Sequence, residues 1–235
     1  MELVSVPFSV TADVARSTAP LRAGEPTESV RNQKRAEFNG PLRSELLGQL
    51  PGCAEGLSLL ARDLGLRGEA LEDLALGCRE DLALLHDGVL TAIAFAFPSG
   101  FRPTSKLGQD FAAVHAPVAD GEVLRAASAG ITAVMKRGHV ERGVWTLTAL
   151  PSLSQHPDLA RPVALQEEDL FFRTEFQVLK ALGGGWTGFS VRVEMTPWVE
   201  LPASSQERIK ASLASMSSAS RSYKNLHEIA ALLGV

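Results

Sequence analysis

DLALLHDGVLTAIAFAF, residues 81–97, carries the clearest strand signal in the chain. Two apolar segments, 81–86 and 89–97, flank the dipeptide Asp87-Gly88. Aspartate followed by glycine suits a two-residue hairpin turn, because such a turn needs positive φ angles. The stretch therefore predicts two antiparallel strands joined by a tight turn.

Three more strands are expected after this hairpin, at 143–150, 170–182 and 187–195. Between the first two strands and these three, EVLRAASAGITAVMKR at 122–137 has apolar residues at helical spacing. The pattern predicts an α+β fold with a mostly antiparallel, five-stranded sheet and a helical crossover. This order of elements is that of a PAS domain, which holds a ligand between its sheet and its helices.

The N-terminal part of the chain has a different pattern. Residues 1 to about 40 contain three prolines and are expected to be irregular, whereas 41–80 show leucines at helical spacing. The tail from Ser204 is expected to be helical. We therefore expect residues 1–78 to form an arm and a helical segment packed on a PAS-like domain of residues 79–235, together as one compact unit.

Composition narrows the function classes. The net charge of −4 does not favour a nucleic-acid partner, and two cysteines cannot build a disulfide framework or a four-cysteine metal site. No apolar run approaches the roughly 18 residues that a membrane span needs. The N-terminal residues lack the pattern of a signal peptide. The expectation is a cytoplasmic protein with no membrane span.

Five histidines are present, and none has a partner at metal-ligand spacing. A single histidine is still enough to ligate haem iron, because the porphyrin supplies the other four nitrogens. His115 fits this role best, since it stands among alanines and valines close to Pro117. On the residues alone, an ordinary buried histidine is the commoner interpretation. Cys78 is a second potential ligand, but its leucine-rich surroundings favour a buried thiol.

Alternation along 171–180 places Arg173, Glu175 and Gln177 on one face of the predicted strand. Such a polar row suits either a solvated face, which is the commoner case, or the wall of a polar cavity. Arg173 and Arg192, the latter on the partner strand, are candidates to receive carboxylates, including haem propionates. Glu175 is a candidate to hold a substrate ammonium group or to relay a proton.

FPSGFRPTSKLGQDFAAVHAPV, residues 97–118, resembles the central motif of the haem-dependent oxidative N-demethylase (dimethylamine monooxygenase α-subunit) family. That motif runs approximately FPSGW, then KLG or KIG, then IHAPVPG. Further segments resemble the family in the same order and at sensible separations, and together they cover most of 79–226. They are REDLALL at 79–85, VWTLTAL at 144–150, FRTEFQVLKAL at 172–182, TGFSVRVEMTPW at 187–198 and SYKNL at 222–226.

The resemblance implies an enzyme that binds haem b and oxidises an amine, by oxidative N-demethylation or N-oxidation. It favours His115 as the iron ligand, with Lys106 and Trp145 beside the two arginines as haem contacts. It also assigns Glu175 and Gln177 to the catalytic site. Electrons are expected from a separate flavin and iron–sulfur reductase, with peroxide as the other oxidant source.

The chain departs from the family pattern at Phe101, at Ala119-Asp120 and at Phe176, where the family has an arginine. We expect the last change to alter the charge of the cavity, and all three suggest a substrate other than dimethylamine. A larger or amino-acid-like amine from a biosynthetic pathway is one such substrate. Two alternatives stay open: a haem-binding sensor or carrier without turnover, and a member that has lost haem.

Overall fold

The computed structural model describes residues 3–10 and 14–235, apart from the side chains of Leu124 and Met135. It has the mixed helices and strands that the α+β prediction requires. The strands are β1 (Ala15–Arg16), β2 (Leu47–Gln49), β3 (Asp81–His86), β4 (Val89–Ala94), β5 (His139–Thr148), β6 (Phe171–Gly183) and β7 (Trp186–Pro197). The helices are α1 (Glu28–Asn39), α2 (Arg43–Leu46), α3 (Ala54–Leu64), α4 (Leu71–Leu76), α5 (Phe111–His115), α6 (Glu122–Ala126), α7 (Ser128–Arg137), α8 (Ala203–Ala214), α9 (Ser218–Tyr223) and α10 (His227–Leu232), with 3-10 turns η1 (Pro103–Lys106), η2 (Glu167–Asp169) and η3 (Trp198–Glu200).

The described strands form one antiparallel sheet in the order β1-β5-β6-β7-β3-β4-β2. It has seven strands, so the predicted number of five was too small. All five predicted strands lie together in its centre, and the two additional strands are its edges. β1 and β2 are two and three residues long, which is too short for alternation to reveal them.

Both predicted hairpins are present. Asp87 and Gly88 have φ angles of 51° and 84°, as the tight β3–β4 turn requires. β4 ends at Ala94, three residues earlier than predicted, since the chain then leaves the ladder and the Phe97 amide donates to the Asp81 carboxylate at 2.8 Å. Three glycines with positive φ join β6 to β7.

The N-terminal predictions were partly wrong. Within the part expected to be irregular, α1 begins where the Thr27 hydroxyl accepts the Val30 amide, and the buried Phe38 anchors it. The helical spacing of the leucines after residue 41 ends early, because Leu47 leaves α2 and pairs with Ala94 as an edge strand. The single helix expected at 122–137 is divided into α6 and α7 at Ala127.

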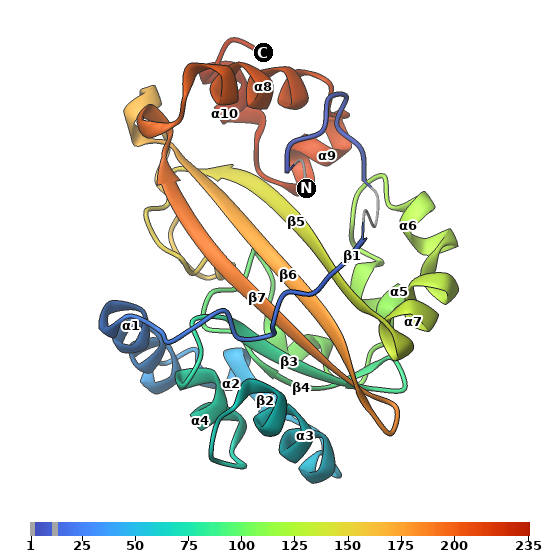
Figure 1. Cartoon of the computed structure of the whole chain (residues 1–235). Coiled ribbons are helices and arrows are strands. Elements are labelled where there is room, and N and C mark those ends of the chain that lie inside the picture. The colour runs from blue at the N-terminus through green and yellow to red at the C-terminus, as the bar shows by residue number, and fades with distance from the viewer. Residues whose placement is uncertain (1–2, 11–13) are drawn as a thin grey trace.

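The two faces of the sheet are covered differently. On β6, Arg173, Glu175, Gln177 and Leu179 define what we call the cavity face, and the alternate residues point to the opposite face. Figure 1 shows α1–α4 at one end of the long strands, α8–α10 at the other, and α5–α7 beside β5. On the opposite face, α3 packs so closely that a Cβ on Gly56 would touch Trp186.

Hydrophobic side chains gather in two clusters. The larger one joins the N-terminal helices to β3 and β4, with Phe38, Leu60 and Leu82 fully buried. The smaller one lies under the C-terminal helices around Trp198. The larger cluster also includes cavity-face residues such as Ile93 and Phe95, and the segment that connects β4 to β5 covers that face.

Candidate functional site

A cavity of about 840 Å³ lies on the cavity face. Its apolar wall comes from β3, β4 and β7, for example Ile93, Phe95 and Phe189. The crossover between β4 and β5, residues 97–137, contributes η1 and α5, and the N-terminal arm contributes Phe8. A volume of this size is near the upper end for sites that bind a cofactor or small molecule.

The turn at 98–100 is fixed to a distant loop. The Gly100 amide donates to the Gln155 carbonyl at 2.9 Å, and the Gln155 amide donates to the Pro98 carbonyl at 2.8 Å. Gly100 has a φ of 77°, a conformation that favours glycine. This local fold directs Ser99 toward β6, where its hydroxyl contacts both Arg173 and Glu175.

His115 lines the cavity from the last residue of α5. Its ring stacks on Phe111 with centroids 4.0 Å apart, and Nδ1 lies 2.8 Å from the Phe111 carbonyl oxygen. A carbonyl only accepts, so Nδ1 carries the proton and Nε2 keeps its lone pair. Burial lowers the pKa of His115 and outweighs the hydrogen bond to Phe111, which raises it, and the charges of Arg142 and Lys106 add to the lowering. The ring is therefore a neutral imidazole of the tautomer that ligates metals.

The polar row on β6 is part of the cavity wall and not a solvated face. Arg173, with 1% of its side chain exposed, donates to Glu175 Oε1 at 2.7 Å and to the Phe97 carbonyl at 2.8 Å. Gln177 Nε2 donates to Glu175 Oε2 at 2.7 Å. Burial alone would raise the pKa of Glu175, but the charge of Arg173 and the bonds from Ser99, Arg173 and Gln177 outweigh it and lower the pKa. Glu175 is thus an ionised carboxylate inside the protein.

The other predicted residues are distributed unevenly. Lys106 lines the cavity, and its Nζ lies 3.4 Å from the Val114 carbonyl. Trp145 borders the cavity, but it pairs with Thr174 in the ladder and its ring packs against Phe172. The indole therefore belongs to the opposite face.

Arg192 does not join the predicted group. It pairs with Phe176 in the ladder, stacks over that ring at 4.8 Å and donates to Glu194 at 3.0 Å. Both residues lie on the opposite face. The expectation that Phe176 changes the charge of the cavity was therefore wrong, because position 176 does not line it.

The cavity-lining residues that were not predicted include Arg161, Tyr223 and Lys224. Lys224 Nζ donates to the Trp145 carbonyl at 3.0 Å. Desolvation lowers the pKa of Lys224 to about 8, although the charge of Glu175 raises it. The SYKNL segment, which resembles the family, was the sequence signal that could have revealed Tyr223 and Lys224. Arg161 lies in a loop with no pattern that could have revealed it.

Cys78 is excluded as an alternative ligand by its place in the hydrophobic core. It is fully buried there, and burial raises the pKa of its thiol to about 12. The thiol is therefore protonated at neutral pH and does not line the cavity.

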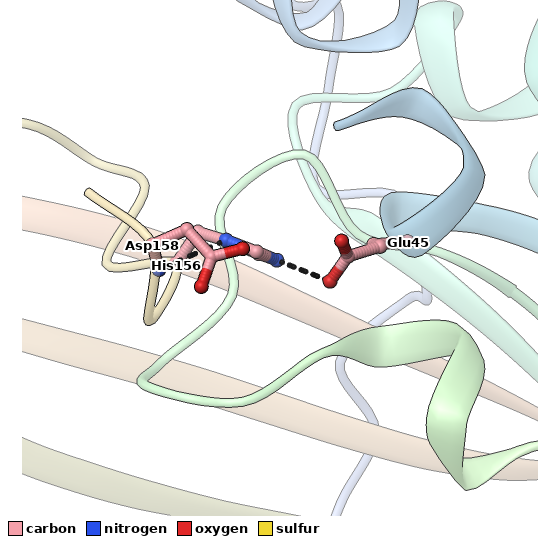
Figure 2. Close-up of side chains that lie close together, drawn as sticks. All are labelled: Glu45, His156 and Asp158. Atoms are coloured by element: carbon pink, nitrogen blue, oxygen red, sulfur yellow. Dashed lines mark hydrogen bonds and ion pairs between the residues drawn. The ribbon is translucent and has the colours of Figure 1, made fainter. Parts of the chain in front are cut away.

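A second polar cluster lies beside the cavity and joins α2 to the loop after β5 (Figure 2). His156 is fully buried, and its Nε2 lies 3.3 Å from Glu45 Oε2, with Asp158 close by. Such a set of ligands would suit a metal ion, but Arg102 already pairs with both carboxylates. The Asp158 amide also donates to Nδ1 at 3.3 Å, which places the imidazole proton on Nε2, facing Glu45. The cluster is thus a network of ion pairs and hydrogen bonds that fixes the loop.

None of the described helices is long and apolar enough to cross a membrane. A family model described as haem-dependent oxidative N-demethylase, alpha subunit-like, matches residues 55–233, which is more than half of the chain. A search of curated proteins found no match.

Proposed function

Because the chain belongs to the haem-dependent oxidative N-demethylase alpha subunit-like family, we propose that it binds haem and oxidises an amine by N-demethylation or N-oxidation. The observation that carries this proposal is His115, a neutral histidine on a large cavity whose Nδ1 is held by a backbone carbonyl. A second hydrogen bond of this kind is the usual way in which proteins fix a metal-ligating imidazole.

The cavity suits haem b in three respects. Nε2 of His115 would bind the iron, the apolar wall would hold the porphyrin, and lining cations would pair with the two propionates. Arg173 is engaged with Glu175 and with carbonyl groups, and Arg192 lies on the other face. We therefore propose Lys106 and Arg161 as the propionate partners.

Glu175 and Gln177 are proposed to hold the substrate. Glu175 Oε1 already accepts from Ser99 and Arg173, whereas Oε2 accepts from Gln177. Oε2 therefore has the greater capacity to accept the N–H of an ammonium group. The lowered pKa of Glu175 makes it a weak base, so we assign it to binding the amine and not to removing its proton.

Haem would supply the oxidation chemistry, and the chain supplies the ligand, the placement and the polarity. Demethylation consumes O₂, two electrons and two protons for each methyl group, and releases formaldehyde, water and the shorter amine. We propose that the electrons come from a separate flavin and iron–sulfur reductase, in keeping with the alpha-subunit description of the family. Peroxide is the other oxidant source.

The remaining sequence predictions stay proposals. The order of the five central strands along the chain, with a helical crossover, supports a PAS-like domain in 79–235. Burial of Phe38 and Leu60 in one cluster with Leu82 supports residues 1–78 as a segment packed on it. A cytoplasmic location is still a prediction.

An absorption spectrum tests the iron ligand. The purified protein with haem should show a Soret band, and His115→Ala should shift or lose it because the proposed iron ligand is removed. His227→Ala, on the exposed start of α10, is the control and should leave the band unchanged. An unchanged ferric spectrum in His115→Ala would exclude His115 as the ligand.

Turnover tests the enzyme. With an amine and a reductase or peroxide, the haem-loaded protein should release formaldehyde or an N-oxidised product steadily. Tight gas binding without any turnover would instead indicate a sensor or carrier, and a protein that stays colourless after haem reconstitution would indicate a member without haem.

A further inference from the structure

The cavity wall carries more positive charge than its own carboxylates neutralise. Arg173 pairs with Glu175, Arg102 pairs with carboxylates of the neighbouring cluster, and Arg142 has an interaction partner of its own. In the described part of the chain, three further lining cations make no ion pair: Lys106, Arg161 and Lys224. Lys106 and Lys224 are half-buried and Arg161 is exposed at the cavity rim. A cation that is partly desolvated without a counter-ion is costly, so these groups favour anionic ligands.

Under the proposed function, the haem propionates would pair with two of the three cations. Lys106 contacts the backbone of Val114, next to His115, so it lies on the segment that carries the iron ligand. Arg161 donates to Gln155 beside the turn that holds Ser99. Haem b has two propionates, and Lys106 and Arg161 would each pair with one of them. Lys224 would then have no propionate as a partner.

Lys224 lies within the electrostatic reach of the proposed amine anchor. The charge of Glu175 acts on Lys224, whose ammonium group sits at the Trp145 carbonyl, 5.9 Å from the Phe8 ring centroid. The carboxylate of Glu175, which would hold the ammonium of the ligand, and the ammonium of Lys224 thus line the same cavity. We propose that the amine bound here also carries a carboxylate, as an N-methyl amino acid does, and that Lys224 binds that carboxylate. This inference rests on the proposed function and names its substrate class.

Matched ligand pairs test the inference on the haem-loaded protein. Each N-methyl amino acid is compared with the amine that lacks only its carboxylate: sarcosine with dimethylamine, N-methylalanine with N-methylethylamine, and N-methylphenylalanine with N-methylphenethylamine. Kd values come from the change in the Soret band and from calorimetry. At least one amino acid should bind about tenfold or more tightly than its partner, as one charge-assisted hydrogen bond would give. If every amino acid binds no better than its amine, or none binds, the inference is overturned.

Variants assign the preference to Lys224. In Lys224→Met the ratio of the two Kd values should fall to about one, whereas Lys224→Arg should keep the preference because it keeps the charge. Lys136→Met removes a lysine on α7 that pairs with Asp87 and does not line the cavity, so it should behave as the wild type. A preference that survives in Lys224→Met would refute the assignment.

The proposed function and the proposed substrate class are contradicted by different results. A missing Soret band counts against the proposed function alone, and the calorimetric comparison can still show tighter binding of the amino acids that Lys224→Met abolishes. A normal Soret band without any preference for the carboxylate overturns only the substrate class.

Discussion

Arg173 and Arg192 show how the side of a strand sets the role of a residue. Arg173 is almost fully buried and its guanidinium is shared among Glu175 and two carbonyl groups. Arg192, with 28% of its side chain exposed, lies over Phe176. Arg173→Met should lower the free energy of unfolding by roughly 3–5 kcal/mol, because it leaves Glu175 buried without a counter-charge.

Arg192→Met is the matched control for that prediction. Its ion pair is partly exposed, so the loss should be about 1 kcal/mol or less. Urea unfolding of the wild type and the two variants measures both changes in the free energy of unfolding. Equal losses in the two variants would show that the side of the strand does not determine the cost.

Single residues also show what could be read from the sequence. Alternation alone placed Arg173, Glu175 and Gln177 on one face, and the structure confirms it. Alternation could not decide the side of Arg192, because the register between β6 and β7 depends on the glycine turn between them. Lys224 and Arg161 reach the cavity from segments far away in sequence, and no local pattern reports such a contact.

At the scale of elements, α3 depends on a glycine where its surface meets the sheet. A Cβ at Gly56 would lie 2.4 Å from a Trp186 ring atom and 2.6 Å from a Leu84 methyl carbon. Alanine ordinarily stabilises a helix interior by about 1 kcal/mol relative to glycine. Here we expect Gly56→Ala to destabilise the protein by roughly 1–3 kcal/mol, because the helix must move away from the sheet.

Gly130 in α7 is the matched control for this substitution. It is exposed, and no atom lies within 4 Å of its ideal Cβ position. Gly130→Ala should therefore follow the helix propensity and raise stability by about 0.5–1 kcal/mol. Thermal unfolding of both variants checks the signs, and a stabilising Gly56→Ala would show that α3 is not packed as described.

Elements with a clear periodic pattern were predicted, and elements without one were not. β3, β6 and β7 follow apolar runs bounded by turn residues, so their existence could be inferred. β2 forms because it pairs with the edge of β4. This tertiary contact overrides the helical spacing that includes Leu47. α1 has a capping threonine, but its polar sequence hides the helix until Phe38 finds the core.

At the scale of the whole molecule, the cavity joins parts of the chain that are distant in sequence: β6, the crossover with α5, and the segment after α9. A ligand that binds only the folded state stabilises it by about 2.7 kcal/mol at a concentration one hundred times its Kd. Haem should therefore slow hydrogen exchange in α5 and in residues 220–225. Helix α3 packs on the opposite face and no described residue of α1 lines the cavity, so local protection in these two helices should not increase. Exchange measured by mass spectrometry with and without haem tests this pattern, and His115→Ala should weaken it. Protection centred on α1 or α3 would mean that haem binds elsewhere, and the cavity would then need a different ligand.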